Sequence, residues 1–487
     1  MTPTQLMAVL PGGLGLHLPE EAADPARVRL ADVTHDSSQA GPGVLFACRP
    51  GQHADGHEFG ARAVAAGSPA LLCERVLPVP VAQILVRSVA EAMGAAAAAI
   101  HGRPSRDLAL IGVTGTSGKT TTTYLVEAAL RAAGHVTGLI GTVETLVAGQ
   151  SAPGVRTTPE ATDIQRLLRR MVSSGVTGAA MEVSSHGLAL GRVCGTRFTA
   201  AVFTNLGHDH LDFHRDFEGY FAAKASLFSR EFTAVGIVNV DDPWGRRLAA
   251  CAPIEIRGVG LASTDAHLAA TDVDAGPEGS TCTVRGDGRR LRLRTRLPGR
   301  FNVMNALCAL AAAQAVGVDL DTAAQGIAEL VGVPGRMERV DAGQPYTVIV
   351  DYAHKPDALR QALAAARPPE ARVIAVVGCG GDRDRDKRPL MGRVAAELAD
   401  LVVLTSDNPR TEDPLSIIDA MVHGARQVPG ARWAVEADRR TAIALALGQA
   451  RIGDVVVIAG KGHESYQEIG DQRLAFDDRL VVRELLR

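Results

Sequence analysis

The chain has 487 residues, which at ~100 to 200 residues per domain predicts about three domains. Hydrophobic residues make up 46% and charged residues 22%, and the 51 Lys and Arg nearly balance the 54 Asp and Glu. This balance gives no basic excess for binding DNA or RNA, so we expect no nucleic-acid partner.

The chain also lacks the usual signals for export or membrane insertion. Its first residues have neither the basic start nor the apolar stretch of a signal peptide, and Pro11 follows early. No later segment is apolar enough to span a bilayer, so we expect no membrane partner. The seven cysteines are scattered and form no CxxC pair, which is typical of reduced cysteines, and the expected location is the cytoplasm.

The first predicted domain covers residues 1–104. Short strand-like runs such as residues 43–47 alternate with Ala-rich helical stretches. The breaker sequence His101-Gly102-Arg103-Pro104 ends this pattern, which predicts a domain boundary there.

A second domain is predicted for residues 105–335. An apolar strand at 108–113 is followed by a Gly-rich loop and a helix, and further strands are expected at 179–183, 200–206 and 236–240. Together they indicate a mainly parallel, helix-covered sheet. The alternation of Arg and Leu at 290–294 predicts an antiparallel insertion within 254–297, followed by a helix near 302–317.

The third predicted domain covers residues 336–487, after the Gly- and Pro-containing segment 331–341. Apolar strands at 372–378, 400–406 and 454–460 alternate with amphipathic helical segments. This is the pattern of a Rossmann-like domain. The expected fold class is therefore α/β, with an N-terminal α/β domain, a central P-loop-like domain with a mainly parallel sheet and a C-terminal Rossmann-like domain.

The strongest chemical signal is the loop Gly115-Thr116-Ser117-Gly118-Lys119-Thr120-Thr121 between a strand and a helix. Backbone N–H groups and the helix dipole favour phosphate there, while Lys119 can reach the outer phosphates and Thr120 a Mg²⁺ ion. The strict P-loop spacing would need Gly at position 113, which is Val113. Strand, loop, lysine and helix in this order still favour phosphate binding over an accidental turn.

Two polar segments follow the next predicted strands. Glu182 could bind the Mg²⁺ ion that Thr120 holds, although an acid at a strand end is as often a solvated or capping residue. Residues 204–214 hold His208, His210 and His214 with two aspartates. HxH spacing suggests zinc, but no cysteine or helical HExxH accompanies it, so a Mg²⁺ site completed by phosphate oxygens is favoured. The alternative is a polar loop with coincidental histidines.

Other residues depend on context. By its residues alone, Lys224 in the helical stretch 220–228 is a surface lysine. In the third domain, loops at 378–383, 407–410 and 460–464 each follow a strand and bring Arg383, Arg410 and Glu464 to one edge of a sheet. They indicate a pocket for a substrate that carries both carboxylate and ammonium groups.

The motifs GTSGKTT, EVSSH, TNLGHDHLDFH, FNVMNA, PGRMERV, VDYAHKPDAL, DNPR and GKGHE resemble, in order and spacing, those of the Mur ligase family over nearly the whole chain. The resemblance implies three domains and an ATP-dependent, amide-bond-forming ligase of peptidoglycan synthesis. Its substrates would be UDP-MurNAc-L-Ala-D-Glu, meso-diaminopimelate and ATP, with Mg²⁺ as cofactor, and the protein would be a monomer. The N-terminal domain would hold the UDP end.

The resemblance also implies residue roles. Lys119, Glu182, His210 and Lys224 would be catalytic, and Mg²⁺ would be bound by Thr120, Glu182, His210 and Lys224, the lysine being carbamylated by CO2. ATP would be bound by residues 115–121 and by Asn302, Asn305, Arg336 and Asp351. The UDP-MurNAc-dipeptide would be bound by Ser37, Gln52, His53, Ala54, Thr157, Thr158, Ser184 and Arg192. Meso-diaminopimelate would be bound by Arg383, Asp407, Asn408, Pro409, Arg410, Gly460 and Glu464.

The resemblance implies that the DNPR form of the 407–410 loop goes with meso-diaminopimelate rather than L-lysine or L-ornithine, since an Arg fork can hold the second carboxylate. The expected reaction passes through an acyl phosphate formed from ATP, which the amine then attacks. Two alternatives are another ligase of this build, such as folylpolyglutamate synthetase or a different Mur enzyme, and a regulatory P-loop NTPase.

Overall fold

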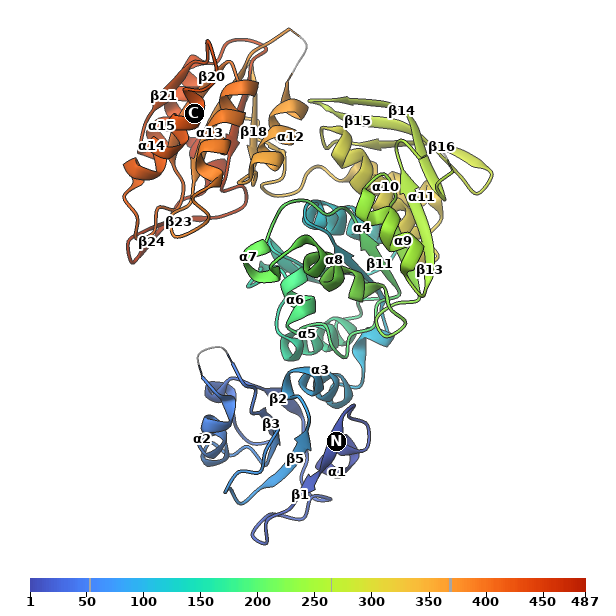
Figure 1. Cartoon of the computed structure of the whole chain (residues 1–487). Helices are drawn as coiled ribbons and strands as arrows, with labels where there is room; N and C mark the ends of the chain where they lie inside the picture. The colour runs from blue at the N-terminus through green and yellow to red at the C-terminus, as the bar shows by residue number, and fades with distance from the viewer. Residues whose placement is uncertain (52–53, 264, 368–369) are drawn as a thin grey trace. The chain divides into compact units, whose positions relative to one another are not determined.

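The computed structural model describes residues 1–51, 54–263, 265–367 and 370–487 (Figure 1). The chain divides into two compact units. The first comprises residues 1–259 and 308–323, and the second comprises residues 260–307 and 324–487. The predicted domain boundaries near residues 104 and 335 stay a prediction.

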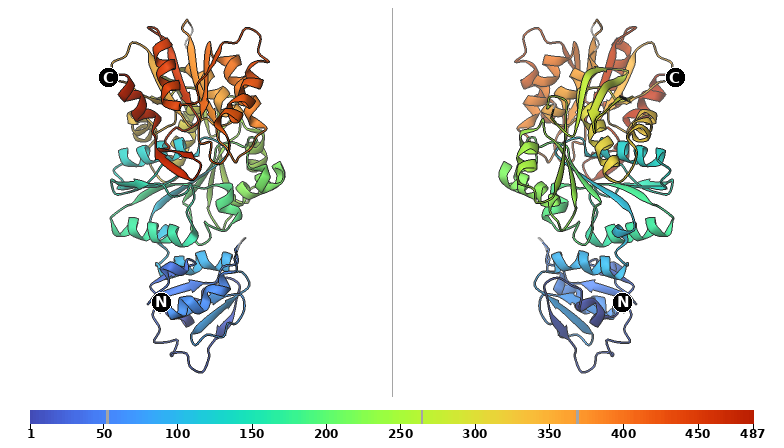
Figure 2. Two further views of the ribbon diagram at one scale, coloured as in Figure 1. Left: turned by 90° about the vertical axis from the view of Figure 1, so that its left-hand side faces the viewer. Right: turned by 90° about the vertical axis from the view of Figure 1, so that its right-hand side faces the viewer.

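The first unit begins with a five-stranded sheet in the order β1-β5-β4-β3-β2. Strands β2 to β5 are parallel, and β1 joins β5 antiparallel. Apolar clusters lie on its two faces, one packed against α3 and one against α2. Figure 2 draws this sheet and its helices in blue. The elements are α1 (Pro3–Met7), β1 (Gly13–His17), β2 (Asp32–Thr34), η1 (Ser37–Gln39), β3 (Val44–Ala47), η2 (Gly56–Phe59), α2 (Gly60–Ala65), β4 (Ala70–Cys73), β5 (Ala82–Val86), α3 (Val89–Ile100) and η3 (Pro104–Arg106).

The same unit contains eight consecutive strands of the central sheet, in the order β13-β12-β11-β6-β10-β7-β8-β9. Strands β13 to β7 of this order are parallel, and β8 and β9 extend the sheet as an antiparallel hairpin. Its strands are β6 (Ala109–Thr114), β7 (Thr137–Ile140), β8 (Glu144–Val147), β9 (Gln150–Pro153), β10 (Gly178–Glu182), β11 (Ala200–Phe203), β12 (Val235–Asn239) and β13 (Glu255–Gly260). Its helices are α4 (Lys119–Ala132), α5 (Ala161–Ser173), α6 (Ser185–Ala189), α7 (Leu211–His214), α8 (Phe217–Ala225), η4 (Ser226–Phe228) and α9 (Pro243–Cys251).

The predicted antiparallel insertion is confirmed in the second unit. Strands β14 (Leu268–Gly276), β15 (Gly279–Gly286) and β16 (Arg289–Thr295) pair antiparallel. Along β16, Arg292 and Arg294 are exposed while Leu293 is buried, because successive side chains of a strand point to opposite faces. Helices α10 (Arg300–Ala315) and α11 (Leu320–Glu329) follow.

The second unit ends with a six-stranded sheet in the order β17-β18-β22-β19-β20-β21, parallel except for β17. Its strands are β17 (Glu338–Arg339), β18 (Thr347–Asp351), β19 (Val373–Cys379), β20 (Leu401–Ser406), β21 (Trp433–Val435) and β22 (Val455–Ala459). Its helices are α12 (Pro356–Ala366), α13 (Lys387–Leu398), α14 (Pro414–Ala425), α15 (Arg439–Gln449) and α16 (Asp478–Leu485). A separate hairpin is formed by β23 (Tyr466–Ile469) and β24 (Gln472–Ala475).

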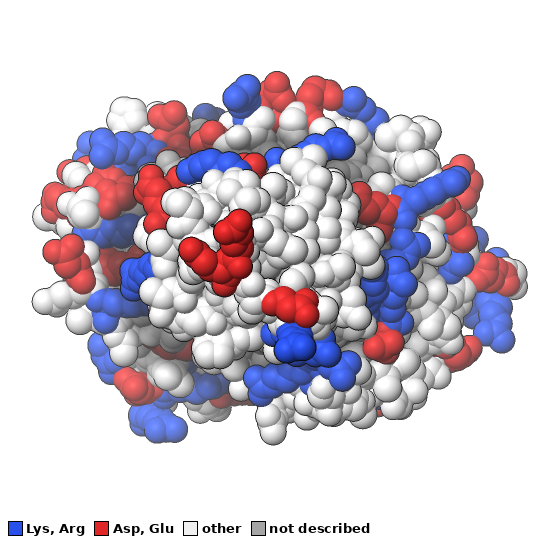
Figure 3. Space-filling view, turned by 90° about the horizontal axis from the view of Figure 1, so that it is seen from below, with Lys and Arg blue, Asp and Glu red and all other residues white. Residues whose placement is uncertain are grey.

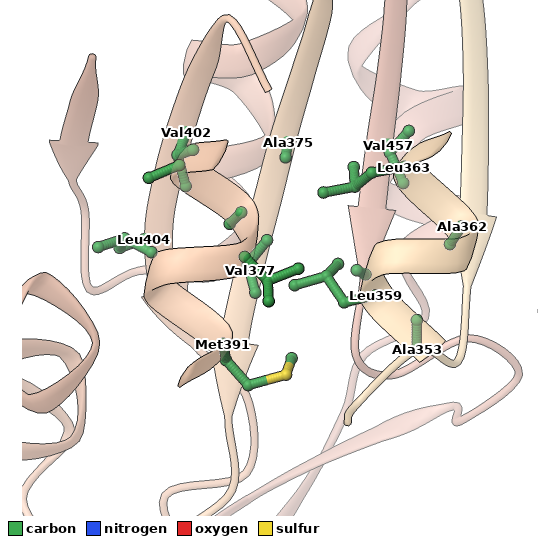
Figure 4. Close-up of a cluster of buried hydrophobic side chains, with 14 of the residues drawn as sticks. Ala353, Leu359, Ala362, Leu363, Ala375, Val377, Met391, Val402, Leu404 and Val457 are labelled. Carbon is green, nitrogen blue, oxygen red and sulfur yellow. The ribbon is translucent and has the colours of Figure 1, made fainter. Parts of the chain in front are cut away.

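Both faces of this last sheet are buried, which explains its continuous apolar strands. Alternate β19 residues, such as Ala375 and Val377, pack against α12, α13 and α14 (Figure 4). Their neighbours Ile374 and Val376 pack against α15 and α16 on the other face. The α/β class and the parallel C-terminal sheet are therefore as predicted.

The described residues contain no helix that is both long and apolar enough to cross a membrane. Acidic and basic side chains are interspersed on the face drawn in Figure 3, and a few acidic side chains lie within its mostly uncharged centre. This pattern agrees with a formal net charge of −3.

Candidate functional site

The predicted phosphate loop connects β6 to α4, and its glycines are required by geometry. Gly115 has φ 147° and Gly118 has φ 88°, both in the region that L side chains rarely adopt. A Cβ atom at Gly115 would also lie 1.9 Å from Thr204 Oγ1. Lys119 Nζ bends back over the loop and donates to the carbonyls of Gly115 at 2.8 Å and Thr116 at 3.1 Å.

The segment after β11 fixes this loop in place. Asn205 Oδ1 accepts from Ser117 N at 3.0 Å, and Thr204 Oγ1 donates to the Ser117 carbonyl at 2.6 Å. Thr116 Oγ1 accepts from Gly207 N at 2.9 Å and bonds the Tyr220 hydroxyl at 3.0 Å. The loop backbone is therefore held before any ligand arrives.

Glu182 lies at the end of β10, beside β6, and is only 1% exposed. Its Oε2 accepts from Thr120 Oγ1 at 3.1 Å and from Thr142 Oγ1 at 3.1 Å, while its Oε1 accepts from Thr142 N at 2.8 Å. The structure therefore brings together two residues predicted to bind Mg²⁺. A buried carboxylate and a hydroxyl are hard oxygen donors, the type that Mg²⁺ prefers.

The residues expected to hold the dipeptide adjoin Glu182. Thr158 Oγ1 donates to the Glu182 carbonyl at 3.0 Å, accepts from Ser184 N at 2.9 Å and lies 3.1 Å from Ser184 Oγ. Thr157 Oγ1 bonds Thr142 Oγ1 at 2.9 Å, and Arg192 Nη1 donates to the Thr158 carbonyl at 3.2 Å. These four predicted residues form one connected group.

Three arginines converge on Glu160, which precedes α5. Its carboxylate lies 2.8 Å from Arg49 Nη1, 2.6 Å from Arg156 Nη1 and 3.0 Å from Arg192 Nε. Burial alone would raise the pKa of Glu160, but the charges of Arg192 and Arg49 lower it below its usual value. The group thus keeps net positive charge beside Thr158, as an anionic substrate would require.

Lys224 is 1% exposed, so the interpretation as a surface lysine, drawn from its residues alone, was wrong. Helix α8 turns its side chain inward, where Nζ donates to the Gly115 carbonyl at 2.8 Å and lies 4.5 Å from the centre of the Tyr220 ring. Lys224 therefore lies directly against the phosphate loop.

His210 is the N-cap residue of α7, with φ 52°, and its Nε2 lies 2.9 Å from Asp209 Oδ2. Its ring packs edge-on against His186 at 4.7 Å. Burial, with the neighbouring His210, lowers the pKa of His186 to about 4. Within the described ranges, no three His, Cys, Asp or Glu side chains gather closely enough to hold a metal ion, which gives the zinc alternative no support. A metal-binding role for His210 stays a prediction.

Of the residues expected to bind the UDP-MurNAc-dipeptide, Ser37 and Ala54 belong to the N-terminal part of the first unit. Ser37 begins the short helix η1 and is half-buried, and Ala54 is exposed, with its carbonyl accepting from Gly51 N at 2.9 Å. Gln52 and His53 lie outside the described residues.

Four expected nucleotide-binding residues belong to the second unit. Asn302 and Asn305 are buried on α10, where Asn305 Nδ2 donates to Asn302 Oδ1 at 3.0 Å. Arg336 lies over the Tyr352 ring at 4.6 Å. Burial raises the pKa of Asp351, despite the nearby Arg336, and its Oδ2 accepts from Met337 N at 2.7 Å.

The three C-terminal loops follow β19, β20 and β22, which are neighbours in one parallel sheet, as predicted. Asn408 Nδ2 donates to Glu464 Oε2 at 2.9 Å, and Arg410 Nη1 donates to the Gly381 carbonyl at 2.8 Å. Asp407 and Gly460 are close enough that a Cβ at Gly460 would lie 2.5 Å from Asp407 Oδ2.

Of the other residues expected to bind meso-diaminopimelate, Arg383 is exposed and Pro409 is buried. Arg383 Nη1 donates to the Asp382 carbonyl at 3.3 Å. The Pro409 carbonyl accepts from Glu412 N at 3.1 Å, which closes the turn after the loop.

Comparison with known proteins gives the family. The model of the Mur ligase family catalytic domain matches residues 29–110, that of the Mur ligase middle domain matches 113–313, and that of the Mur ligase glutamate ligase domain matches 335–462. The chain is 47% identical to the UDP-N-acetylmuramoyl-L-alanyl-D-glutamate–2,6-diaminopimelate ligase of Streptomyces avermitilis, covering 99% of this chain and 96% of that protein. The chain belongs to the Mur ligase family.

Further relatives agree with this membership. The ligase of the same name from Gloeobacter violaceus is 48% identical over 94% of each chain. A solved structure of a UDP-N-acetylmuramoyl-L-alanyl-D-glutamate–2,6-diaminopimelate ligase superposes with a TM-score of 0.72 at 33% identity, covering 100% of this chain and 98% of that one. The ADP complex of MurF from Thermotoga maritima, at 18% identity and a TM-score of 0.62, shares the Mur ligase fold.

Sequence analysis of this Mur ligase missed several residues of the site. Glu182 accepts a hydrogen bond from Thr142, Arg192 contacts Glu160, and Thr116 bonds Tyr220. No motif spacing marks Thr142, Glu160 or Tyr220. Lys461 is 0% exposed, and its Nζ donates to Asn408 Oδ1 at 3.0 Å and Glu464 Oε2 at 3.1 Å. Its position within the GKGHE motif was the one signal that could have identified it.

Proposed function

We propose that the protein joins an amine of meso-diaminopimelate to the D-Glu carboxylate of UDP-MurNAc-L-Ala-D-Glu in an ATP-dependent reaction of peptidoglycan synthesis. The products are the UDP-MurNAc-tripeptide, ADP and phosphate. The family membership and the named relatives support this activity. The Arg410 loop supports meso-diaminopimelate as the amine, because an Arg fork suits a second carboxylate.

The observation that carries the proposal is the hydrogen-bonded link from Thr120 through Glu182 to Thr158. It joins the phosphate loop to the residues proposed to hold the dipeptide. ATP bound at the phosphate loop and the dipeptide bound beside Thr158 would bring the γ-phosphate close to the acceptor carboxylate. Holding two reactants in this way is a large part of catalysis when no protein nucleophile is used.

The reaction then proceeds in two steps. A carboxylate oxygen of D-Glu attacks the γ-phosphorus, the bond to the bridging oxygen breaks, and ADP leaves with that electron pair. The uncharged amine attacks the acyl carbon, phosphate leaves, and the amine proton passes to solvent. Lys119 would exchange its bonds to the Gly115 and Thr116 carbonyls for bonds to phosphate oxygens.

Thr120, Glu182, His210 and a carbamylated Lys224 are the residues proposed to hold Mg²⁺. Their oxygen donors fit the ion, which would neutralise phosphate charge during transfer. We propose that Lys224 Nζ, once it has lost a proton, adds to the carbon of CO2 and becomes a carbamate. Its burial against the phosphate loop places that anion where a cation site can use it.

We also propose that the nucleotide is bound by Asn302, Asn305, Arg336 and Asp351. The proposed location of the protein is the cytoplasm. All seven cysteines are free and five are buried, which supports a reducing compartment.

The test measures ADP release and tripeptide formation with ATP, Mg²⁺ and UDP-MurNAc-L-Ala-D-Glu, with meso-diaminopimelate, L-lysine and L-ornithine offered separately. Product with meso-diaminopimelate alone is the expected result. Product with lysine or ornithine instead would keep the ligase and overturn the role of Arg410. ATP hydrolysis with no product from any amine would overturn the ligase proposal and favour a regulatory NTPase.

A further inference from the structure

The hairpin β23–β24 contacts the 407–410 loop through three of its residues. Gln467 Nε2 donates to the Asp407 carbonyl at 2.7 Å. Glu468 N donates to Asn408 Oδ1 at 3.0 Å, and the Glu468 carbonyl accepts from Arg410 N at 3.0 Å. Gly470 N donates to the Arg410 carbonyl at 2.7 Å, so both backbone groups of Arg410 bind the hairpin.

Arg410 needs this support because its backbone is strained. Its φ of 53° lies in the left-handed region, which a residue with a long side chain rarely adopts. The loop thus presents the arginine in one fixed backbone conformation.

The side chain of Arg410 is held from two directions. Arg410 Nε lies 3.0 Å from Glu468 Oε2, and Nη1 donates to the Gly381 carbonyl at 2.8 Å. Both side chains are partly exposed, 24% for Arg410 and 31% for Glu468, so the contact adds little to stability. Its effect is on geometry: an arginine otherwise has many rotamers, and a bidentate contact needs one of them.

We propose that Glu468 is a positioning residue for amino-acid selection, which orients the Arg410 guanidinium toward the second carboxylate of meso-diaminopimelate. This inference rests on the proposed function and extends it to a residue that acts through Arg410. L-Lysine has no second carboxylate, so its use does not depend on an oriented Arg410.

Removing Glu468 has two opposite effects on the affinity for meso-diaminopimelate, and the test shows which is larger. Loss of the negative charge leaves Arg410 less neutralised, which would favour binding of an anionic group. Loss of the contact frees the guanidinium, which weakens a bidentate bond that needs fixed geometry. The proposal holds that the second effect is larger.

The experiment measures kcat and KM for each substrate in the full-length wild-type protein and in the variants E468A, E468Q, R410A and E468A/R410A. For E468A, we expect the KM for meso-diaminopimelate to rise about tenfold, the effect of losing one charge-assisted hydrogen bond. The KM for ATP and for the UDP-linked acceptor should stay within about twofold. E468Q, which keeps an oxygen acceptor for Nε, should show a smaller rise.

The double variant separates positioning from general damage. If Glu468 acts through Arg410, E468A adds little to the loss already caused by R410A. The surface variant E484Q, which removes an exposed partner of Arg440, is the matched control in the same unit and should match the wild type. Thermal unfolding of each variant checks that the fold is kept.

The outcomes distinguish this inference from the proposed function. No tripeptide from the wild type would overturn the proposed function itself. Tripeptide from the wild type together with an unchanged or lower KM for meso-diaminopimelate in E468A would overturn only the role of Glu468. Equal rises in all three KM values, or losses that add in the double variant, would show a merely structural contribution and overturn it too.

Discussion

Lys224 and Glu182 are two buried charged residues whose surroundings make them functional candidates. Glu182 is 1% exposed, yet its two oxygens accept from Thr120 and Thr142. Lys224 is equally buried, and Nζ bonds a carbonyl of the phosphate loop. Burial of a charge has a large cost in free energy, so such groups are retained where a ligand or metal uses them.

The variant E182Q tests the carboxylate charge. The amide oxygen can still accept from Thr142 N, so the fold should survive while the rate of ADP release falls by about 10²-fold or more, the scale of losing one preorganised electrostatic group. The apparent Mg²⁺ requirement should rise as well. The control is E218Q, because Glu218 on α8 is an exposed ion-pair partner of Arg247. Full activity of E182Q at ordinary Mg²⁺ concentrations would contradict the proposed metal site.

Carbamylation of Lys224 is tested by K224R, which keeps the positive charge but cannot hold a carbamate. We expect a loss of turnover of about 10²-fold or more, because an anion at the site is replaced by a cation. With ¹³C-labelled bicarbonate, the wild type should show a carbamate carbon resonance that K224R lacks. An active K224R variant, or identical spectra, would show that the unmodified lysine is sufficient.

At the scale of elements, β2 and α5 are joined by a carboxylate near the start of the chain. Asp32, the first residue of β2, accepts from Arg166 Nε at 2.7 Å and lies 3.0 Å from His101 Nε2. Burial alone would raise the pKa of Asp32, but hydrogen bonds from His101 and Arg166 lower it below its usual value. A lowered pKa in the folded state means that this carboxylate stabilises the fold only while it is ionised.

The resulting pH dependence has a definite sign. The stability from Asp32 is fully present above the unfolded-state pKa of about 3.9 and is lost as pH falls through the lower folded-state pKa. Urea unfolding between about pH 6 and pH 3 should therefore show a steeper acid loss of stability for the wild type than for D32N. At neutral pH, D32N should be less stable by about 1–2 kcal/mol.

The control for this series is D24N, which removes an exposed partner of Arg27. It should follow the wild-type curve. Parallel curves for the wild type and D32N would show that Asp32 does not contribute in this way.

The short hairpins β8–β9 and β23–β24 were not predicted from the sequence patterns, unlike the antiparallel strands β14–β16. The strands β8–β9 and β23–β24 are short, and several of their residues are exposed on both faces. The alternation of apolar and polar residues that marks a half-buried strand is therefore weak there. The long buried strands β6, β19 and β22 were predicted close to their observed bounds because burial on both faces requires continuous apolar runs.

For the whole molecule, separate sheets with separate apolar clusters predict unfolding in more than one step. One fully buried ion pair allows this to be tested. Arg439 and Asp478 are both 0% exposed in their side chains, and Arg439 Nη2 donates to Asp478 Oδ2 at 2.7 Å and to the Ala459 carbonyl at 3.1 Å. The pair joins α15 and α16 to the end of β22.

The variant D478A leaves a buried arginine without its carboxylate and should destabilise the C-terminal sheet by about 3–5 kcal/mol. In differential scanning calorimetry, one transition should move to lower temperature while the transition of the N-terminal and central sheets stays in place. E484A, at an exposed position of the same helix, is the control. A single transition that shifts as a whole would show that the sheets unfold together.

The sequence by itself determined the α/β class, the order of the strands along the chain and the loops that carry the chemistry. These features are local: apolar runs, glycines at left-handed positions and a lysine before a helix act within a few residues. The tertiary structure decided which side chains meet. It buried Lys224 against the phosphate loop, placed Glu160 among three arginines and put Glu468 beside Arg410. Each of these contacts joins segments through the register of a sheet or the packing of a helix, which no local pattern specifies.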